Sequence, residues 1–201
     1  MRRSGTCSRR EPRPTSAAAR SAAALLLCAV AVLPAAGTPC QAKVFMTQEE
    51  ALKTAFPAGV TPQRLTAYLT DAQAEAVEKA SGQPGGSRVV TYYKTPGLTA
   101  WFDTHTVRTL AETVMIVVTD AGEIARVDIL SFSEPEEYKP RPRWMEQLHG
   151  KTLTEDLSLR RGIHGISGAT LSARAIVSAS RRVLALHHVV CGEPSKKEAT
   201  P

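Results

Sequence analysis

A short run of small residues stands directly before the last predicted helix, in the stretch 162–176 (GIHGISGATLSARAI). The first turn of a helix leaves backbone N–H groups without intrahelical partners and carries the positive end of the helix dipole. Gly168 and Ala169 have almost no side chain, so a ligand can approach this backbone closely. Thr170 adds a hydroxyl in the same turn, and Arg174 follows four residues later on the same helix face. This combination is typical of an anion site, most often one for phosphate.

Two other interpretations of this stretch do not involve a phosphate. In the first, Ser167 is an ordinary N-cap, and the small residues beside it allow close packing against a sheet. In the second, Ser167 is a hydrolase nucleophile, but the G-x-S-x-G elbow requires a glycine where Ala169 stands. No spacing favours His105, His149 or His164 as the base. The hydrolase interpretation is therefore disfavoured, whereas the N-cap interpretation stays open.

The elements that position this loop change in character at Arg88. Three segments before it have a helical pattern, and they span residues 46–56, 61–69 and 70–81. Thr47 and Glu50 form a capping-box pattern at the start of the first, and Gly82 ends the last. The sequence therefore predicts a helical lead-in over residues 43–86.

After this lead-in, β-branched and aromatic runs replace the helical period. The four runs cover 88–94, 98–107, 112–122 and 124–133, and Asp120–Gly122 reads as a tight hairpin between the last two. A short helix is expected at 144–148, and a long one at 169–189 has an apolar stripe suited to packing on a sheet. The predicted fold class is α+β, with an antiparallel meander of about four or more strands, a helical N-terminal lead-in and a C-terminal helix packed on the sheet.

The positive charge of the chain, a net +6, lies almost entirely in its first 42 residues. These hold six of the 25 basic residues and one of the 19 acidic ones, which leaves 19 basic and 18 acidic side chains in residues 43–201. A nucleic-acid-binding domain would carry its charge on the folded part, so no nucleic-acid partner is expected. A basic opening, an apolar stretch and a small-residue exit instead predict a signal peptide or N-terminal membrane anchor at 1–42.

The sequence GISGATLS, followed by an amphipathic helix, resembles the flavinylation motif of the FMN-binding domain family. That family includes extracytoplasmic flavinylated subunits of Rnf-type and sodium-translocating NADH:quinone reductase complexes. The preceding meander and the segment SEPEEY add to the resemblance, which covers roughly residues 88–190. The expected division is a leader (1–42), the lead-in (43–86), an FMN-binding domain (87–190) and a flexible tail (191–201).

The resemblance implies that Thr170 is the acceptor to which a flavin transferase joins FMN through its phosphate, as a phosphoester. The motif otherwise falls on Ser167, Gly168, Ala169, Leu171 and Ser172, and we add Arg174 as a phosphate contact and His105 and Trp101 as neighbours of the flavin ring. One departure is that the family motif commonly has an acidic residue where this chain has His164.

These observations predict an exported FMN-binding electron-transfer protein, periplasmic or membrane-anchored and facing outside the cytoplasm. We find no acid–base pair and no metal cluster, so an electron carrier is favoured over an enzyme with its own substrate. Its partners would be a flavin transferase for maturation and redox proteins or a membrane electron-transport complex. His164 favours an alternative, a cofactor-free envelope binding module that keeps the same fold.

Overall fold

The computed structural model describes residues 43–84 and 86–192. The predicted signal peptide or anchor at 1–42 lies outside the described residues, as does most of the predicted tail at 191–201. The described residues all fall in one compact unit of the chain.

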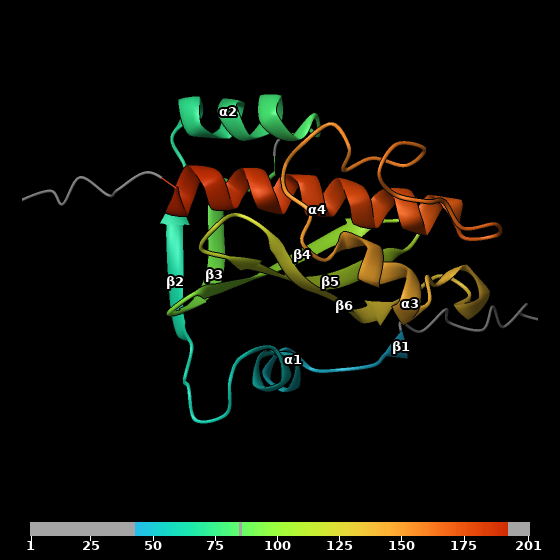
Figure 1. Cartoon of the computed structure of the whole chain (residues 1–201), viewed down its shortest axis with the longest axis horizontal. Helices are drawn as coiled ribbons and strands as arrows, with labels where there is room; N and C mark the ends of the chain where they lie inside the picture. Colours follow the sequence, from blue (N-terminus) through green and yellow to red (C-terminus); the bar gives the residue numbers. More distant parts are fainter. Residues whose placement is uncertain (1–42, 85, 193–201) are drawn as a thin grey trace, which may run out of the picture. The chain divides into compact units, whose positions relative to one another are not determined.

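A six-stranded antiparallel sheet forms the centre of this unit (Figure 1). Its strands, in the spatial order β1-β6-β5-β4-β3-β2, are β1 (Lys43–Val44), β6 (Ile124–Phe132), β5 (Ala111–Thr119), β4 (Leu98–Thr106), β3 (Val89–Thr95) and β2 (Gln63–Tyr68). Strands β3 to β6 follow one another along the chain and in space, which confirms the predicted meander. The hairpin at Asp120–Gly122 is also confirmed, with Gly122 at a φ of 79°.

The helices surround this sheet on both faces. They are α1 (Gln48–Ala55), α2 (Asp71–Ser81), α3 (Pro142–Met145) and α4 (Thr170–Cys191), and two 3-10 turns are η1 (Glu136–Tyr138) and η2 (Glu146–Leu148). Thr47 and Glu50 form the predicted capping box of α1, and Thr70 forms another with Gln73 on α2. Helix α2 ends at Gly82, whose φ of 66° is in the left-handed region that glycine adopts without strain.

The helix predicted at 61–69 is wrong, because Gln63–Tyr68 form strand β2. Leu65 and Ala67 are half-buried and alternate with exposed neighbours, as in a strand with one covered face. Over so short a segment the apolar residues fit both periods, and the pairing of Leu65 with Tyr92 on β3 decides between them.

Apolar side chains pack on both faces of the sheet. On one face, Ile116 and Val114 of β5 contact the predicted stripe of α4, including Ile176 and Val183. On the other face, α1 covers a smaller cluster in which Ala51 and Phe56 lie among Met115, Val117 and Leu130. Figure 1 shows α2 on the far side of α4 from the sheet. Alternate residues of β5 thus supply the two cores, as the pleat of a strand requires.

The connection that precedes α4 is held in place by α3 and η2. The Trp144 indole N–H donates to the carbonyl of His164 at 2.6 Å, and the His164 N–H donates to the Gln147 side chain at 2.9 Å. At Gly162 a Cβ atom would lie 2.4 Å from the Asp156 carbonyl oxygen, so only glycine fits. These contacts fix the path by which the small residues reach the start of α4.

Candidate functional site

Helix α4 begins at Thr170 without a side-chain cap. Its N-cap residue is Ala169, and no side chain accepts a hydrogen bond from the first turn. The alternative interpretation of Ser167 as an N-cap, which the sequence left open, is therefore wrong. Helices α1 and α2 of the same chain both have complete capping boxes, so the open first turn is a local property of α4. It leaves N–H donors and the positive end of the helix dipole available to an anion.

The hydroxyl of Thr170 is accessible. Thr170 is exposed, and its Oγ1 donates a hydrogen bond to the Ile166 carbonyl at 3.0 Å. Because Oγ1 is the donor in this hydrogen bond and the carbonyl oxygen the acceptor, the bond does not use the lone pairs of Oγ1. Gly168, two residues earlier, has a φ of 86° and open space where a side chain would stand. An electrophilic group can therefore reach this oxygen.

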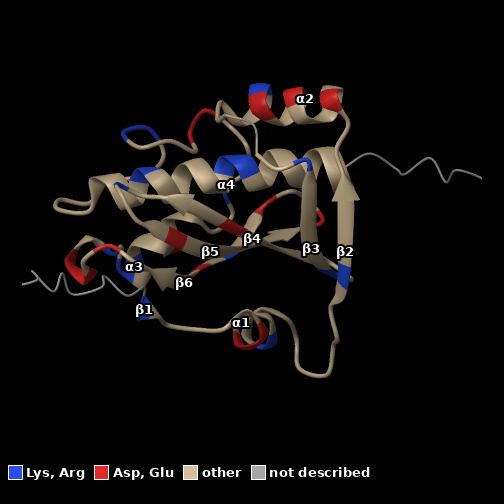
Figure 2. Ribbon diagram, turned by 180° about the vertical axis from the view of Figure 1, so that it is seen from behind, with Lys and Arg blue, Asp and Glu red and all other residues tan. Residues whose placement is uncertain are grey.

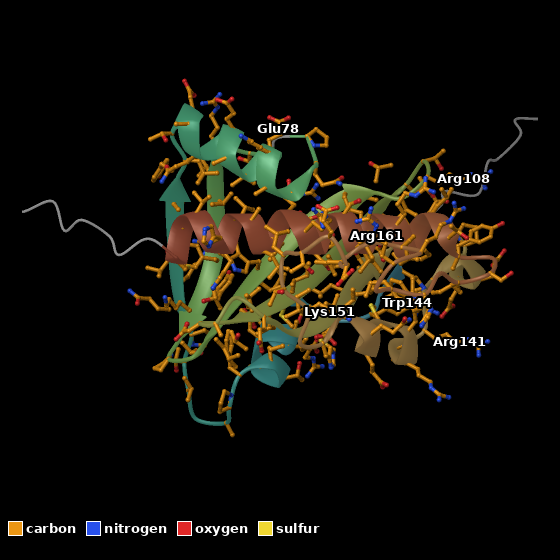
Figure 3. The ribbon with its side chains drawn as sticks, turned by 45° about the horizontal axis from the view of Figure 1, so that its top comes forward. Glu78, Arg108, Arg141, Trp144, Lys151 and Arg161 are labelled. Atoms are coloured by element: carbon orange, nitrogen blue, oxygen red, sulfur yellow. The ribbon has the colours of Figure 1, made fainter. Side chains whose placement is uncertain are left out.

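A small cavity of about 250 Å³ lies beside this turn. The motif supplies one side of it, from Gly168 to Ser172, and the other side comes from Val107, Arg108, Glu134 and Tyr138. The Ser172 hydroxyl is buried and has no hydrogen-bond partner among the described residues. Arg108 is exposed and has no ion pair in the part of the chain that the structure describes; Figure 3 shows it near the N-terminal end of α4.

Glu134 lines this cavity, and its carboxylate is engaged in hydrogen bonds with the loop between β4 and β5. Its carboxylate accepts hydrogen bonds from the N–H groups of Thr109 and Leu110, at 2.7 and 2.9 Å, and from the Thr109 hydroxyl. These bonds lower the pKa of Glu134, so it stays ionised and fastened to the β4–β5 hairpin. Neither Glu134 nor Tyr138 was predicted as a site residue, although both stand in the SEPEEY segment that contributes to the family resemblance.

A second cavity, of about 460 Å³, opens on another side of Thr170. Arg160, Arg174 and Arg181 line this second cavity. Arg174, which was predicted as a phosphate contact, therefore does not line the small cavity. Figure 2 shows the basic residues of α4, a helix that contains no acidic residue. Arg181 follows Arg174 by seven residues on α4, a helical spacing that could have pointed to it, whereas no spacing pattern points to Arg160 in the connection before α4.

The structure does not bring His105 and Trp101 to Thr170. Both line a third cavity, of about 610 Å³, where β3 and β4 diverge beyond the pair Tyr92 and Trp101. Trp101 is buried and stacks on Tyr92, with ring centroids 4.8 Å apart. His105 lies in a buried network with the carboxylates of its own strand and of β5.

This network joins β4, β5 and α4. His105 hydrogen-bonds Asp103 at 2.8 Å and Glu112 at 3.1 Å, and Arg182 of α4 holds Asp103 through two nitrogen atoms at 2.9 and 2.8 Å. Burial alone would lower the pKa of His105, but the two carboxylates outweigh it and raise this pKa to about 9. Burial raises the pKa of Glu112. Among the described residues no group of His, Cys, Asp and Glu side chains is arranged to hold a metal ion.

His164 is exposed at the position where the resembling family commonly has an acid. Its backbone hydrogen-bonds to Trp144 and Gln147, and its side chain makes no hydrogen bond or ion pair within the described residues. The geometry at Thr170 fits a phosphate without it: free amides, the unpartnered Ser172 hydroxyl and Arg108 surround a reachable oxygen. At about 250 Å³ the small cavity fits the phosphate and the adjoining chain of a nucleotide better than a whole one.

Comparison with known proteins gives one match. No curated protein and no solved structure matches the chain. None of the helices in the described residues is long and apolar enough to cross a membrane. Residues 110–185 match the family model described as FMN-binding domain, a segment that contains Thr170 and both sides of the small cavity except Val107 and Arg108. The match supports flavin binding, and residues 110–185 are similar to the FMN-binding domain family.

Proposed function

We propose that this chain is an exported electron carrier that holds FMN covalently, as a phosphoester on Thr170. One observation carries the proposal: the exposed Thr170 hydroxyl stands at the uncapped N-terminus of α4, inside the segment that matches the FMN-binding domain. The redox chemistry is that of the flavin, and the protein supplies position and electrostatics.

The residues around Thr170 would each contribute to binding the phosphate. In the net reaction the Oγ1–H bond and one P–OH bond of FMN break, an Oγ1–P bond forms and one water leaves. The hydrogen bond from Oγ1 to the Ile166 carbonyl is lost with the proton. The remaining phosphate charge then lies at the positive end of α4, within reach of its free amides and of the Ser172 hydroxyl. Arg108 adds a cation at the opposite wall.

The proposed location and partners follow from this chemistry. A cofactor that dissociates outside the cytoplasm is not easily replaced, so a covalent link suits an exported carrier. The leader-like composition of residues 1–42 supports export or membrane anchoring. Maturation would require a flavin transferase, and electrons would pass to and from redox proteins or a membrane complex.

Mass spectrometry of the intact protein tests the attachment. We expect residues 43–201, produced together with a flavin transferase, to gain the mass of one FMN minus one water. Thr170→Ala should abolish the gain, because no oxygen remains to form the ester. Thr170→Ser is the matched variant: it keeps the hydroxyl and should retain some of the modification.

The alternative is a cofactor-free binding module, which the absence of an acid at His164 favours. An unmodified mass in the presence of a transferase that modifies another substrate would support that module and contradict the carrier. A His164→Asp variant then separates two causes. If this variant is modified and the wild type is not, the transferase requires an acidic residue at position 164, and the cavity beside Thr170 can accept the FMN phosphate.

A further inference from the structure

We infer that the 460 Å³ cavity beside Thr170 seats the ring system of the attached flavin, and that Arg160 and Arg174 raise its reduction potential. This inference rests on the proposed function, because it concerns the same cofactor. It assigns the second of two cavities that share Thr170 as a lining residue.

The size and the chemistry of the two cavities suit different parts of the cofactor. The free amides of α4 and the unpartnered Ser172 hydroxyl lie at the small cavity, so the phosphate belongs there. The small cavity is below the range of roughly 300–1,000 Å³ in which proteins enclose ligands of drug size, whereas the larger one is within it. A group esterified to Thr170 can therefore extend from the first cavity into the second.

One face of α4 forms a continuous floor for the larger cavity. Thr170, Arg174, Ser178 and Arg181 line it at helical spacing, over about 16 Å at 1.5 Å per residue. The end of α2 and the segment 158–160 provide the remaining walls. The floor thus leads away from the phosphate along the helix, with guanidinium groups beyond the attachment point.

The lining of this cavity contains three arginines and no Asp or Glu. Arg160 and Arg174 have no ion pair in the described residues, and Arg181 donates to the carbonyls of Ser81, Thr154 and Leu157. Arg160 adopts a φ of 74°, uncommon for a residue other than glycine, and its N–H donates to Ile163 at 3.1 Å.

Guanidinium groups suit a flavin for two reasons. Their planes stack on aromatic rings and their N–H groups donate to ring carbonyls. Their charge also stabilises electrons that the ring gains, since charge near the ring nitrogens tunes the electronics of a flavin. Reduction to the anionic form adds two electrons and one proton to the ring; the redox partner, or dithionite in a titration, supplies the electrons.

Redox titration of the flavinylated protein tests the inference. We expect Arg174→Gln to lower the reduction potential of the flavin. At the wild-type midpoint potential, the ratio of oxidised to reduced flavin should rise about tenfold, and this change corresponds to about 30 mV for a two-electron couple. Arg160→Gln with Arg174→Gln should shift it further. Arg174→Lys keeps the charge and should stay near wild type. Arg143→Gln removes an exposed arginine that does not line the cavity and should change nothing.

Salt provides a second readout of the same charges. At 1 M salt the Debye length is about 3 Å, so the wild-type potential should fall toward that of the double variant. Equal potentials for wild type and the double variant at low salt would overturn the inference and leave the attachment intact. A chain that carries no FMN after coexpression would overturn the inference together with the proposed function, and intact mass distinguishes the two failures.

Discussion

At the scale of single residues, the site depends on polar groups that the protein leaves without partners. The helix start at Thr170 has no cap, and the Ser172 hydroxyl is buried without a hydrogen bond in the described structure. A buried hydroxyl that lacks a partner costs about 1–3 kcal/mol, and Ser172 differs from other such groups in lining the small cavity. A phosphate oxygen in the small cavity would provide the missing partner.

Ser172→Ala should therefore stabilise the unmodified protein and weaken its response to an anion. We expect the free energy of unfolding to rise by about 1 kcal/mol, because an unpaired hydroxyl is removed and alanine is the better helix former. The gain in stability on adding inorganic phosphate should shrink. Urea unfolding with and without phosphate measures both.

Ser180→Ala is the matched control for this experiment. The Ser180 hydroxyl is also buried on α4 without a partner in the described residues, but it does not line the small cavity. It should give a similar gain in stability with the phosphate response unchanged. The assignment of Ser172 to the phosphate would be contradicted if the two variants responded to phosphate alike.

At the scale of elements, the buried network of Asp103, His105, Glu112 and Arg182 fastens α4 to the sheet. It bridges β4, β5 and the middle of α4 on the same face as the larger core, and α4 carries Thr170 at its N-terminal end. The raised pKa of His105 makes this link sensitive to pH. The protonated form stabilises the fold, since the folded state binds this proton more tightly than the unfolded chain.

Stability should therefore decrease with rising pH in a defined window. The contribution of His105 is fully present below its unfolded pKa of 6.5 and is lost as the pH rises through about 9. The shift corresponds to about 3 kcal/mol at 1.36 kcal/mol per pKa unit. Urea unfolding at pH 6, 7, 8 and 9.5 measures the slope.

A double variant isolates the source of this slope. His105→Gln with Glu112→Gln removes the histidine without leaving the fully buried Glu112 carboxylate unpaired. It should lose most of the decrease above pH 6.5, while His149→Gln, at an exposed site, should keep it. An unchanged slope in the double variant would mean that other groups titrate.

At the scale of the whole molecule, residues 43–86 are part of the fold and not a detached lead-in. Ala51 and Phe56 of the α1 region complete the core on the face opposite α4, and Val77 of α2 is buried. Strand β2 pairs along almost the whole of β3. The FMN-binding domain match at 110–185 therefore covers only part of the structural unit that supports Thr170.

Removing residues 43–86 should destabilise the remainder. We expect a chain of residues 87–192 to aggregate or to unfold at a clearly lower temperature than residues 43–192, because Met115, Val117 and Leu130 would lose their cover. Differential scanning calorimetry and size-exclusion chromatography of the two chains make the comparison. Equal melting temperatures and a monomeric short chain would contradict a structural role for these residues.

The sequence alone determined the features that depend on local chemistry. The capping box at Thr47, the glycine that ends α2, the hairpin at Asp120–Gly122 and the start of α4 near Thr170 all follow from neighbouring residues. The backbone conformations of these features are set by residues within a few positions along the chain, so the local sequence pattern is sufficient to predict them. The α+β class followed in the same way from the change of period at Arg88.

Only the tertiary structure decided which distant residues meet. Pairing with β3 made 63–68 a strand, and the register of β4 placed His105 and Trp101 at a cavity away from Thr170. Arg108 and Arg160 reach the two cavities beside Thr170 from loops far apart in the sequence. Such contacts depend on the packing of whole elements, for which one sequence carries no local signal. The sequence motif was sufficient to identify the Thr170 hydroxyl, whereas the residues that surround it could be identified only from the tertiary structure.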